Sequence, residues 1–194
     1  MMTPARALLV ASLLLLPAAG PANAAPAASD TNALQFLGFR AGARLDELDA
    51  QLRRLGGGPL RCRRSKVDRR VSECRAKLTD PALSGVADIW ISAIDSAAGV
   101  ITISGAVLPE RLDLWRHALQ QRYGTVGTRV QGSQSMLQWV RRGRMMRLTW
   151  RLEGSGKVAS VSLVDGRVLD DWGRSRSPSP AAAPGGSRTG SLSS

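Results

Sequence analysis

The chain is poor in the residue types from which metal and redox sites are built. Its 194 residues include two cysteines and one histidine, His117. A structural zinc site takes four Cys or His ligands, and this chain does not hold enough of them for such a site. We therefore expect neither a bound metal nor a cofactor.

The chain also lacks the local motifs of common hydrolases and nucleotide-binding proteins. It has no Gly-x-Ser-x-Gly motif, and close pairs of carboxylates occur only at Asp46-Glu47 and Asp170-Asp171. The run 154–157 (GSGK) resembles part of a phosphate-binding loop, but it joins two predicted strands and the following helix is missing. We assign no catalytic residue, and His117 is expected on the solvent side of its helix.

Long hydrophobic runs are absent except at the N-terminus. Arg6 precedes the apolar run 7–16, and Ala22-Asn23-Ala24 fits a small-x-small cleavage site. This order predicts a secretory signal peptide over residues 1–24, cleaved near Ala24, because the run is too short to cross a bilayer as a helix. An uncleaved membrane anchor is the alternative. We expect a mature chain with no transmembrane segment, located in the periplasm or outside the cell.

The two ends of the mature chain predict little structure. Residues 25–34 look like a flexible lead, and residues 173–194 form a basic tail rich in Ser, Pro and Gly. Such a tail cannot bury enough apolar surface to offset the entropy of ordering it, so we expect it to be disordered. Residues 35–172 remain as a single globular domain, long enough for one core.

The stretch 61–77 (RCRRSKVDRRVSECRAK) predicts a basic β-hairpin closed by a disulfide. In an oxidising compartment, Cys62 and Cys74 most simply pair with each other, although two reduced thiols are the alternative. A symmetric hairpin centred on Asp68 places them opposite each other, close enough to bond. Side chains alternate along a strand, so the cysteines point inward. Four basic side chains then point outward: Arg61, Arg63, Arg75 and Lys77.

Hydrophobic periodicity predicts two helices and seven strands. Leucines 45, 48, 52 and 55 form a helical stripe that ends at three glycines, and Pro109 and Gly124 bound the second helix. Alternating patterns predict the two arms of the hairpin, 86–95 and 100–107 as strands before the second helix, and three strands after it. The order helix–four strands–helix–three strands predicts an α+β fold in two layers, an antiparallel sheet of about six to seven strands with two helices on one face.

This pattern resembles small secreted α+β proteins of the β-lactamase-inhibitor-protein type and the small lipoprotein of outer-membrane assembly. The resemblance is carried by Gly42-x-x-Leu45-x-x-Leu48 at a helix start, by Leu55-Gly56 at its end and by the strands that follow. It implies protein binding by the exposed sheet face and transfers no catalytic residue. The chain differs from the lipoprotein in having no cysteine to lipidate, and from the inhibitors in having one expected disulfide.

Basic residues dominate the charge, with 27 Lys and Arg against 15 Asp and Glu. A GC-rich genome would raise the arginine content, but not its clustering at 61–77 and 141–151. We therefore predict an exported small binding protein of the bacterial cell envelope, whose basic sheet face binds an anionic protein surface, a lipid headgroup or an envelope polymer. The candidate binding residues are Arg61, Arg63, Arg75, Lys77, Trp90, Arg147 and Arg151.

Three other interpretations stay open. The charged face is equally consistent with simple solvation. A small periplasmic hydrolase, with a site between the helices and the sheet, is the alternative function. The charge permits nucleic-acid binding, but export and the absence of a recognisable reading motif argue against it.

Overall fold

The computed structural model describes residues 33–79, 85–154 and 156–176. The predicted signal peptide, most of the predicted lead and the tail beyond residue 176 lie outside the described residues. Ala33 and Leu34 are already buried, so the folded part begins slightly earlier than the predicted boundary at residue 35.

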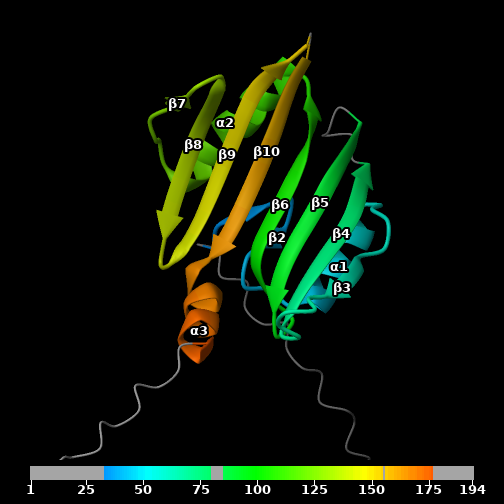
Figure 1. The fold of residues 1–194 in the computed structure, drawn as a ribbon. Helices are drawn as coiled ribbons and strands as arrows, with labels where there is room; N and C mark the ends of the chain where they lie inside the picture. Colours follow the sequence, from blue (N-terminus) through cyan, green and yellow to red (C-terminus); the bar gives the residue numbers. More distant parts are fainter. Residues whose placement is uncertain (1–32, 80–84, 155, 177–194) are drawn as a thin grey trace, which may run out of the picture. The chain divides into compact units, whose positions relative to one another are not determined.

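An eight-stranded antiparallel sheet forms one layer of the fold (Figure 1). Its strands follow the order β3-β4-β5-β6-β10-β9-β8-β7. Their bounds are β3 (Arg61–Arg64), β4 (Val71–Thr79), β5 (Val86–Ile94), β6 (Ala97–Val107), β7 (Arg129–Gln131), β8 (Gln134–Arg141), β9 (Arg144–Glu153) and β10 (Gly156–Asp165).

Two helices, α1 (Leu45–Arg54) and α2 (Pro109–Tyr123), lie on the same face of this sheet (Figure 1). Leu48 and Leu52 of α1 are buried, as the leucine stripe predicted, and Leu112 and Leu119 of α2 are buried likewise. The α+β, two-layer architecture predicted from the sequence is therefore confirmed.

The sheet consists of two similar halves. The helix α1 precedes the meander β3–β6, and α2 precedes the meander β7–β10. The two meanders meet where β6 pairs with β10, antiparallel, over eight residue pairs. The sequence-based count of seven strands missed β7, because its three residues are all exposed and therefore carry no alternation of burial.

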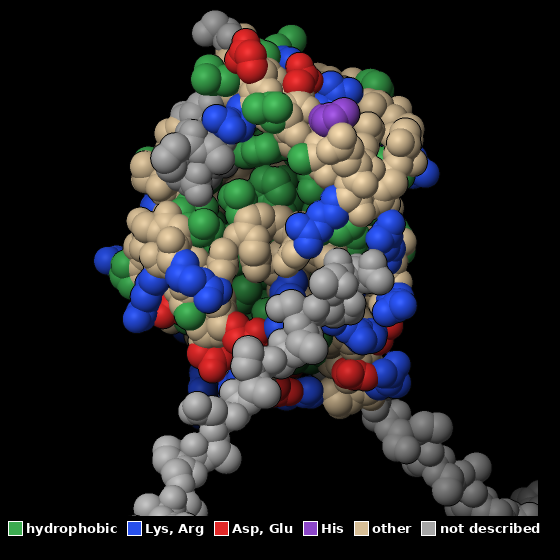
Figure 2. Space-filling model, turned by 180° about the vertical axis from the view of Figure 1, so that it is seen from behind, with side chains coloured by type: hydrophobic (Ala, Val, Ile, Leu, Met, Phe, Trp, Pro, Cys, Tyr) green, Lys and Arg blue, Asp and Glu red, His purple; other side chains and the backbone are tan. Residues whose placement is uncertain are grey.

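A small hairpin precedes α1 in the chain and forms hydrogen bonds with both α1 and α2. It is formed by β1 (Gln35–Phe36) and β2 (Phe39–Arg40). The Gln51 amide of α1 donates to the Leu37 carbonyl at 2.8 Å, and the Gln35 backbone N–H donates to the Tyr123 hydroxyl of α2 at 3.0 Å. Figure 2 shows the molecule from behind the view of Figure 1. Hydrophobic side chains gather in the middle of that side. The hairpin thus adds Phe36 and Phe39 to the core between the helices and the sheet.

A third helix, α3 (Gly166–Arg176), follows directly on β10. The sequence pattern predicted a turn here and no helix, because Asp165-Gly166 has the composition of a turn. Contacts with distant parts of the chain hold it: the Trp172 indole N–H donates to Asp68 at 2.8 Å, and Arg70 donates to the Ser175 hydroxyl at 2.5 Å. The described helix continues four residues past the predicted domain boundary at residue 172.

Candidate binding face

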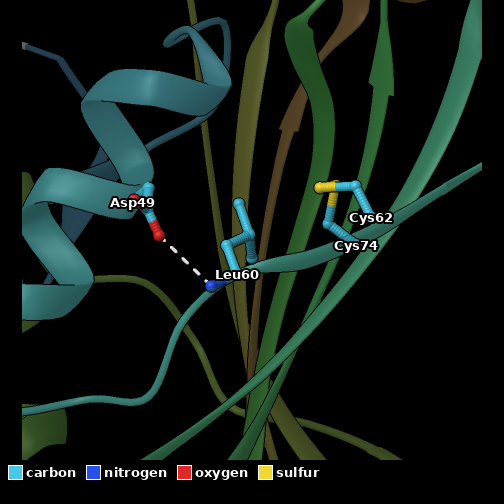
Figure 3. Close-up of a disulfide and its surroundings, with 4 residues drawn as sticks. All are labelled: Asp49, Leu60, Cys62 and Cys74. Carbon is cyan, nitrogen blue, oxygen red and sulfur yellow. Dashed lines mark hydrogen bonds between the residues drawn. A yellow bond between two sulfur atoms is a disulfide. The ribbon is translucent and has the colours of Figure 1, made fainter.

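The disulfide-closed hairpin has the predicted register. Cys62 is opposite Cys74, and the two form a disulfide with their Cα atoms 3.9 Å apart. Cys74 is fully buried and Cys62 is exposed, because β3 is the edge strand of the sheet. The backbone N–H of Leu60 donates to the Asp49 carboxylate at 3.2 Å (Figure 3). The base of the hairpin is therefore fixed both across its strands and to α1.

The predicted binding residues all lie on the sheet face opposite α1 and α2. The neighbouring Ile89, Ile91, Ile101 and Ile103 are at most 3% exposed and face the helices. Because side chains alternate along a strand, Trp90 and Thr102 point to the other side. Figure 1 shows this near side of the eight strands with no helix lying across it.

One straight line of residues crosses most of this face. The strand registers pair Arg75 with Trp90, Trp90 with Thr102, Thr102 with Ser162, Ser162 with Arg147, and Arg147 with Gln138. We call these six residues the central row: Arg75, Trp90, Thr102, Ser162, Arg147 and Gln138. Arg61 on the edge strand extends the line beyond Arg75.

The edge of the face next to β3 carries uncompensated positive charge. Arg61 and Arg75 are both exposed and directly opposite each other, and neither pairs with a carboxylate of the described residues. Arg63 is opposite Glu73 in the register, also without an ion pair among the described residues. Lys77, in contrast, is neutralised by Asp88 at 2.5 Å. The positive charge of this edge is thus concentrated on the arginines.

The middle of the face is polar but uncharged. Thr102 and Ser162 are half-buried, and their hydroxyl oxygens lie 3.4 Å apart. Ser104 and Ser160 form the next pair along β6 and β10. Trp90, also half-buried, lies between these hydroxyls and Arg75.

A second basic position lies on β9. The guanidinium of Arg147 donates two hydrogen bonds to the Gln138 side-chain oxygen, at 2.9 and 3.1 Å. Gln138 is neutral, so it orients the guanidinium without cancelling its charge. Arg151, four residues along the strand, is paired with Glu153 at 3.2 Å. Strands β5, β6 and β10 separate these arginines from the basic hairpin, so the two basic clusters do not form one continuous patch.

A shallow hollow of about 520 Å³ lies at the far end of the central row. Its lining consists of Val126, Gly127, Thr128, Arg129, Gln138 and Val140. No sequence pattern predicts this hollow, because it depends on the segment after α2 passing close to β8 and the edge strand β7. The lining contains no carboxylate and no histidine, so it offers no acid or base for hydrolysis.

The strongest buried ion cluster lies away from this face, at the junction of β10 and α3. Asp165 is 1% exposed and accepts hydrogen bonds from Arg144 at 2.7 Å and from Arg167 at 3.0–3.3 Å. Burial alone would raise the pKa of this carboxyl, but the two guanidinium groups together lower it. The cluster holds α3 to the sheet, and its carboxylate is fully occupied.

Metal-binding clusters and membrane-spanning helices are both absent from the part of the chain that the structure describes. No group of three or more His, Cys, Asp or Glu side chains is placed to hold a metal ion. None of the described helices combines the length and the hydrophobicity needed to cross a membrane. His117 is exposed on α2, as predicted.

Comparisons with known proteins place the chain in no family: no family model, no curated protein and no solved structure matches it.

Proposed function

We propose that this chain is an exported small binding protein of the bacterial cell envelope, which uses the helix-free face of its sheet to bind an anionic partner. One observation carries the proposal. Arg61 and Arg75 lie directly opposite each other on that face, exposed and without a carboxylate partner among the described residues.

This arrangement costs stability. Like charges directly opposite each other in an antiparallel pair are destabilising. Several other described arginines do pair with carboxylates: Arg40 lies 2.6 Å from Glu47, and Arg53 lies 2.5 Å from Asp49. The opposed arginines are therefore better explained by a partner than by folding.

Protection of the sheet edge does not explain both arginines. Charged side chains on an edge strand discourage unwanted strand pairing, and Arg61 on β3 suits that role. Arg75 lies on β4, which is paired on both sides, so it has no edge to protect. Its exposed guanidinium is available for a bidentate contact with a carboxylate or a phosphate.

The rest of the proposal rests on the predicted signal peptide and on the disulfide. Disulfides persist in the periplasm and outside the cell, so the Cys62–Cys74 bond supports export. No observation favours the hydrolase alternative.

A salt series tests the proposal. The full chain is titrated with an anionic and a neutral partner, such as polyglutamate and pullulan, at low and high ionic strength. Binding only to the anionic partner, and weakening with salt, is the expected result because exposed charges are screened. An affinity that does not change with salt would contradict the proposal.

A pair of variants locates the surface. Arg61→Gln together with Arg75→Gln removes two charges from the proposed face, and should weaken binding. Arg53→Gln together with Arg54→Gln removes the same charge from exposed positions on α1, on the other side of the sheet, and should not. Equal weakening by both double variants would show that only net charge matters.

A further inference from the structure

We propose that the anionic partner is an acidic polysaccharide that lies along the central row, with a sugar ring stacked on Trp90 and its acidic groups on Arg75 and Arg147. This inference rests on the proposed function and specifies the class of partner.

The spacing of charge in the central row suits an extended ligand. Arg75 on β4 and Arg147 on β9 are four strand steps apart, β4 to β5 to β6 to β10 to β9. With about 4.8 Å between neighbouring strands, their backbones are about 19 Å apart. One small anion cannot contact both guanidinium groups, whereas a chain that carries an acidic group at intervals can.

The surface between the two arginines suits a ligand rich in hydroxyl groups. Thr102 and Ser162 each offer a hydroxyl, which can donate one hydrogen bond and accept two. Their mutual contact of 3.4 Å is long for a hydroxyl pair, so both groups can take other partners. Ser104, Ser160 and Thr149 continue the hydroxyl surface in the adjacent row.

Trp90 provides the apolar contact that sugars need. It is the one aromatic side chain in the central row, half-buried and flanked by a guanidinium and a hydroxyl. The C–H face of a pyranose ring is apolar, and an indole ring offers a large rigid surface against which it can stack. Hydroxyls beside the ring can then bind the polar edge of the same sugar.

The same composition argues against a protein partner. The energetic centres of protein interfaces are enriched in Trp, Tyr and Arg, whereas Ser and Thr are under-represented there. In this face Ser and Thr occupy the centre and arginine the two flanks. A polysaccharide uses central hydroxyls and flanking charges together, while an acidic protein surface would use only the flanks.

Contacts within the sheet orient Arg147 for this role. Gln138 accepts from Nε and Nη2 of Arg147, and Nη2 also contacts the Met145 sulfur at 4.0 Å, which leaves Nη1 for an acidic group, since a guanidinium has five N–H donors. Beyond Gln138, the hollow lined by Thr128 and Arg129 can take the end or a substituent of the chain.

Binding of the full chain to four probes tests the inference: polygalacturonate, pullulan, polyglutamate and phosphatidylglycerol vesicles. Polygalacturonate, which carries carboxylates on sugar rings, should bind most tightly at equal charge concentration, and neutral pullulan should not bind. Trp90→Ala should weaken binding of polygalacturonate about fivefold and leave polyglutamate unchanged, because only the sugar stacks on the ring. Trp90→Phe should restore part of the affinity.

A residue on the other side of the sheet supplies a matched control. Arg147→Gln should weaken polygalacturonate binding about fivefold through the loss of a charge-assisted contact. Arg54→Gln removes the same charge from an exposed position on α1, where the guanidinium also donates to a glutamine oxygen, that of Gln51, so it should have little effect. Unchanged thermal unfolding would show that each variant is folded.

The possible failures are distinguishable. If polyglutamate or the vesicles bind as tightly as polygalacturonate and Trp90→Ala has no effect, the inference of a polysaccharide fails. The proposed function, binding of an anionic partner, would then still hold. If no anionic probe binds at low salt, both this inference and the proposed function fail.

Discussion

Thr102 and Ser162 lie directly opposite each other where the two halves of the sheet meet, with their hydroxyl oxygens 3.4 Å apart. On the other side of the same strands, Ile101 pairs with Leu163 and Ile103 with Val161. These four apolar side chains are at most 3% exposed. The join therefore presents hydroxyls to one face and derives its stability from the apolar contacts on the other.

The first prediction concerns the cohesion of the two halves. Leu163→Ala should lower the free energy of unfolding by about 2–5 kcal/mol, the usual cost of truncating a buried leucine. Because the pair Ile101–Leu163 lies at the join, urea unfolding followed by tryptophan fluorescence and by circular dichroism should still show one shared transition. Ser162→Ala, on the hydroxyl side, is the control and should change stability little. Two separate transitions in the wild-type chain would show that the halves fold independently.

Local patterns explain most of what could be predicted from the sequence. Strict alternation assigned the inward isoleucines and the outward Trp90 correctly, and the symmetry of the hairpin about Asp68 gave the register of Cys62 and Cys74. These features depend on residues close together in the chain. The helix α1 was equally predictable, because its leucine stripe and its three terminal glycines are local.

The elements that were missed depend on distant contacts. The helix α3 is held by Trp172 on Asp68 and by Asp165 between two arginines, contacts that no periodicity reveals. Strand order is also non-local, and it decided the shape of the candidate site. Because β10 rather than β7 pairs with β6, a row of hydroxyls separates the hairpin arginines from Arg147.

The second prediction concerns the disulfide. The bond between Cys62 and Cys74 closes a loop with a sequence separation of 12, which in the chain-entropy model stabilises the fold by about 3 kcal/mol. Reductant should lower the urea midpoint of the wild-type chain accordingly. The double variant Cys62→Ala/Cys74→Ala should not respond to reductant. Mass spectrometry should show a gain of two hydrogens on reduction, and free thiols in the unreduced exported protein would contradict the assignment.

The third prediction concerns acid stability. Two guanidinium groups hold the pKa of Asp165 below its ordinary value, so the unfolded chain takes up the proton at a higher pH than the folded chain. The stabilisation is therefore complete above the unfolded pKa of about 3.9 and is lost as the pH falls through the lower, folded pKa.

Urea unfolding of the wild-type chain and of Asp165→Asn between pH 7 and pH 2.5 measures this contribution. At pH 7 the variant should be less stable by about 3 kcal/mol, because a buried pair has lost its charge on one side. The difference should shrink as the pH approaches the bottom of that range. A difference that is constant over the whole series would show that the charge of Asp165 does not contribute.

The fourth prediction compares two glycines in the left-handed region. Gly42 has φ +83°, and a Cβ at this position would meet the Asp165 carboxylate oxygen at 2.4 Å; Gly56 has φ +74° and open space around it. Gly56→Ala should lower the free energy of unfolding by about 1–2 kcal/mol, because an alanine is strained in this backbone conformation. Gly42→Ala should cost clearly more, because it also displaces Asp165 from its arginines. Equal losses in thermal unfolding would show that this contact is unimportant.

The fifth prediction concerns the link between α3 and the tip of the basic hairpin. The indole N–H of Trp172 donates to Asp68 at 2.8 Å, and Arg70 contacts both Asp95 and Ser175. Trp172→Phe keeps most of the packing and removes this hydrogen bond, so amide hydrogen exchange should become faster in the hairpin turn. Exchange in α1, which has no hydrogen bond or ion pair with α3 among the described residues, should stay the same and provides the internal control. Unchanged exchange in the turn would show that α3 does not restrain the hairpin, and that the disulfide and the β4–β5 pairing hold the arginines in place without it.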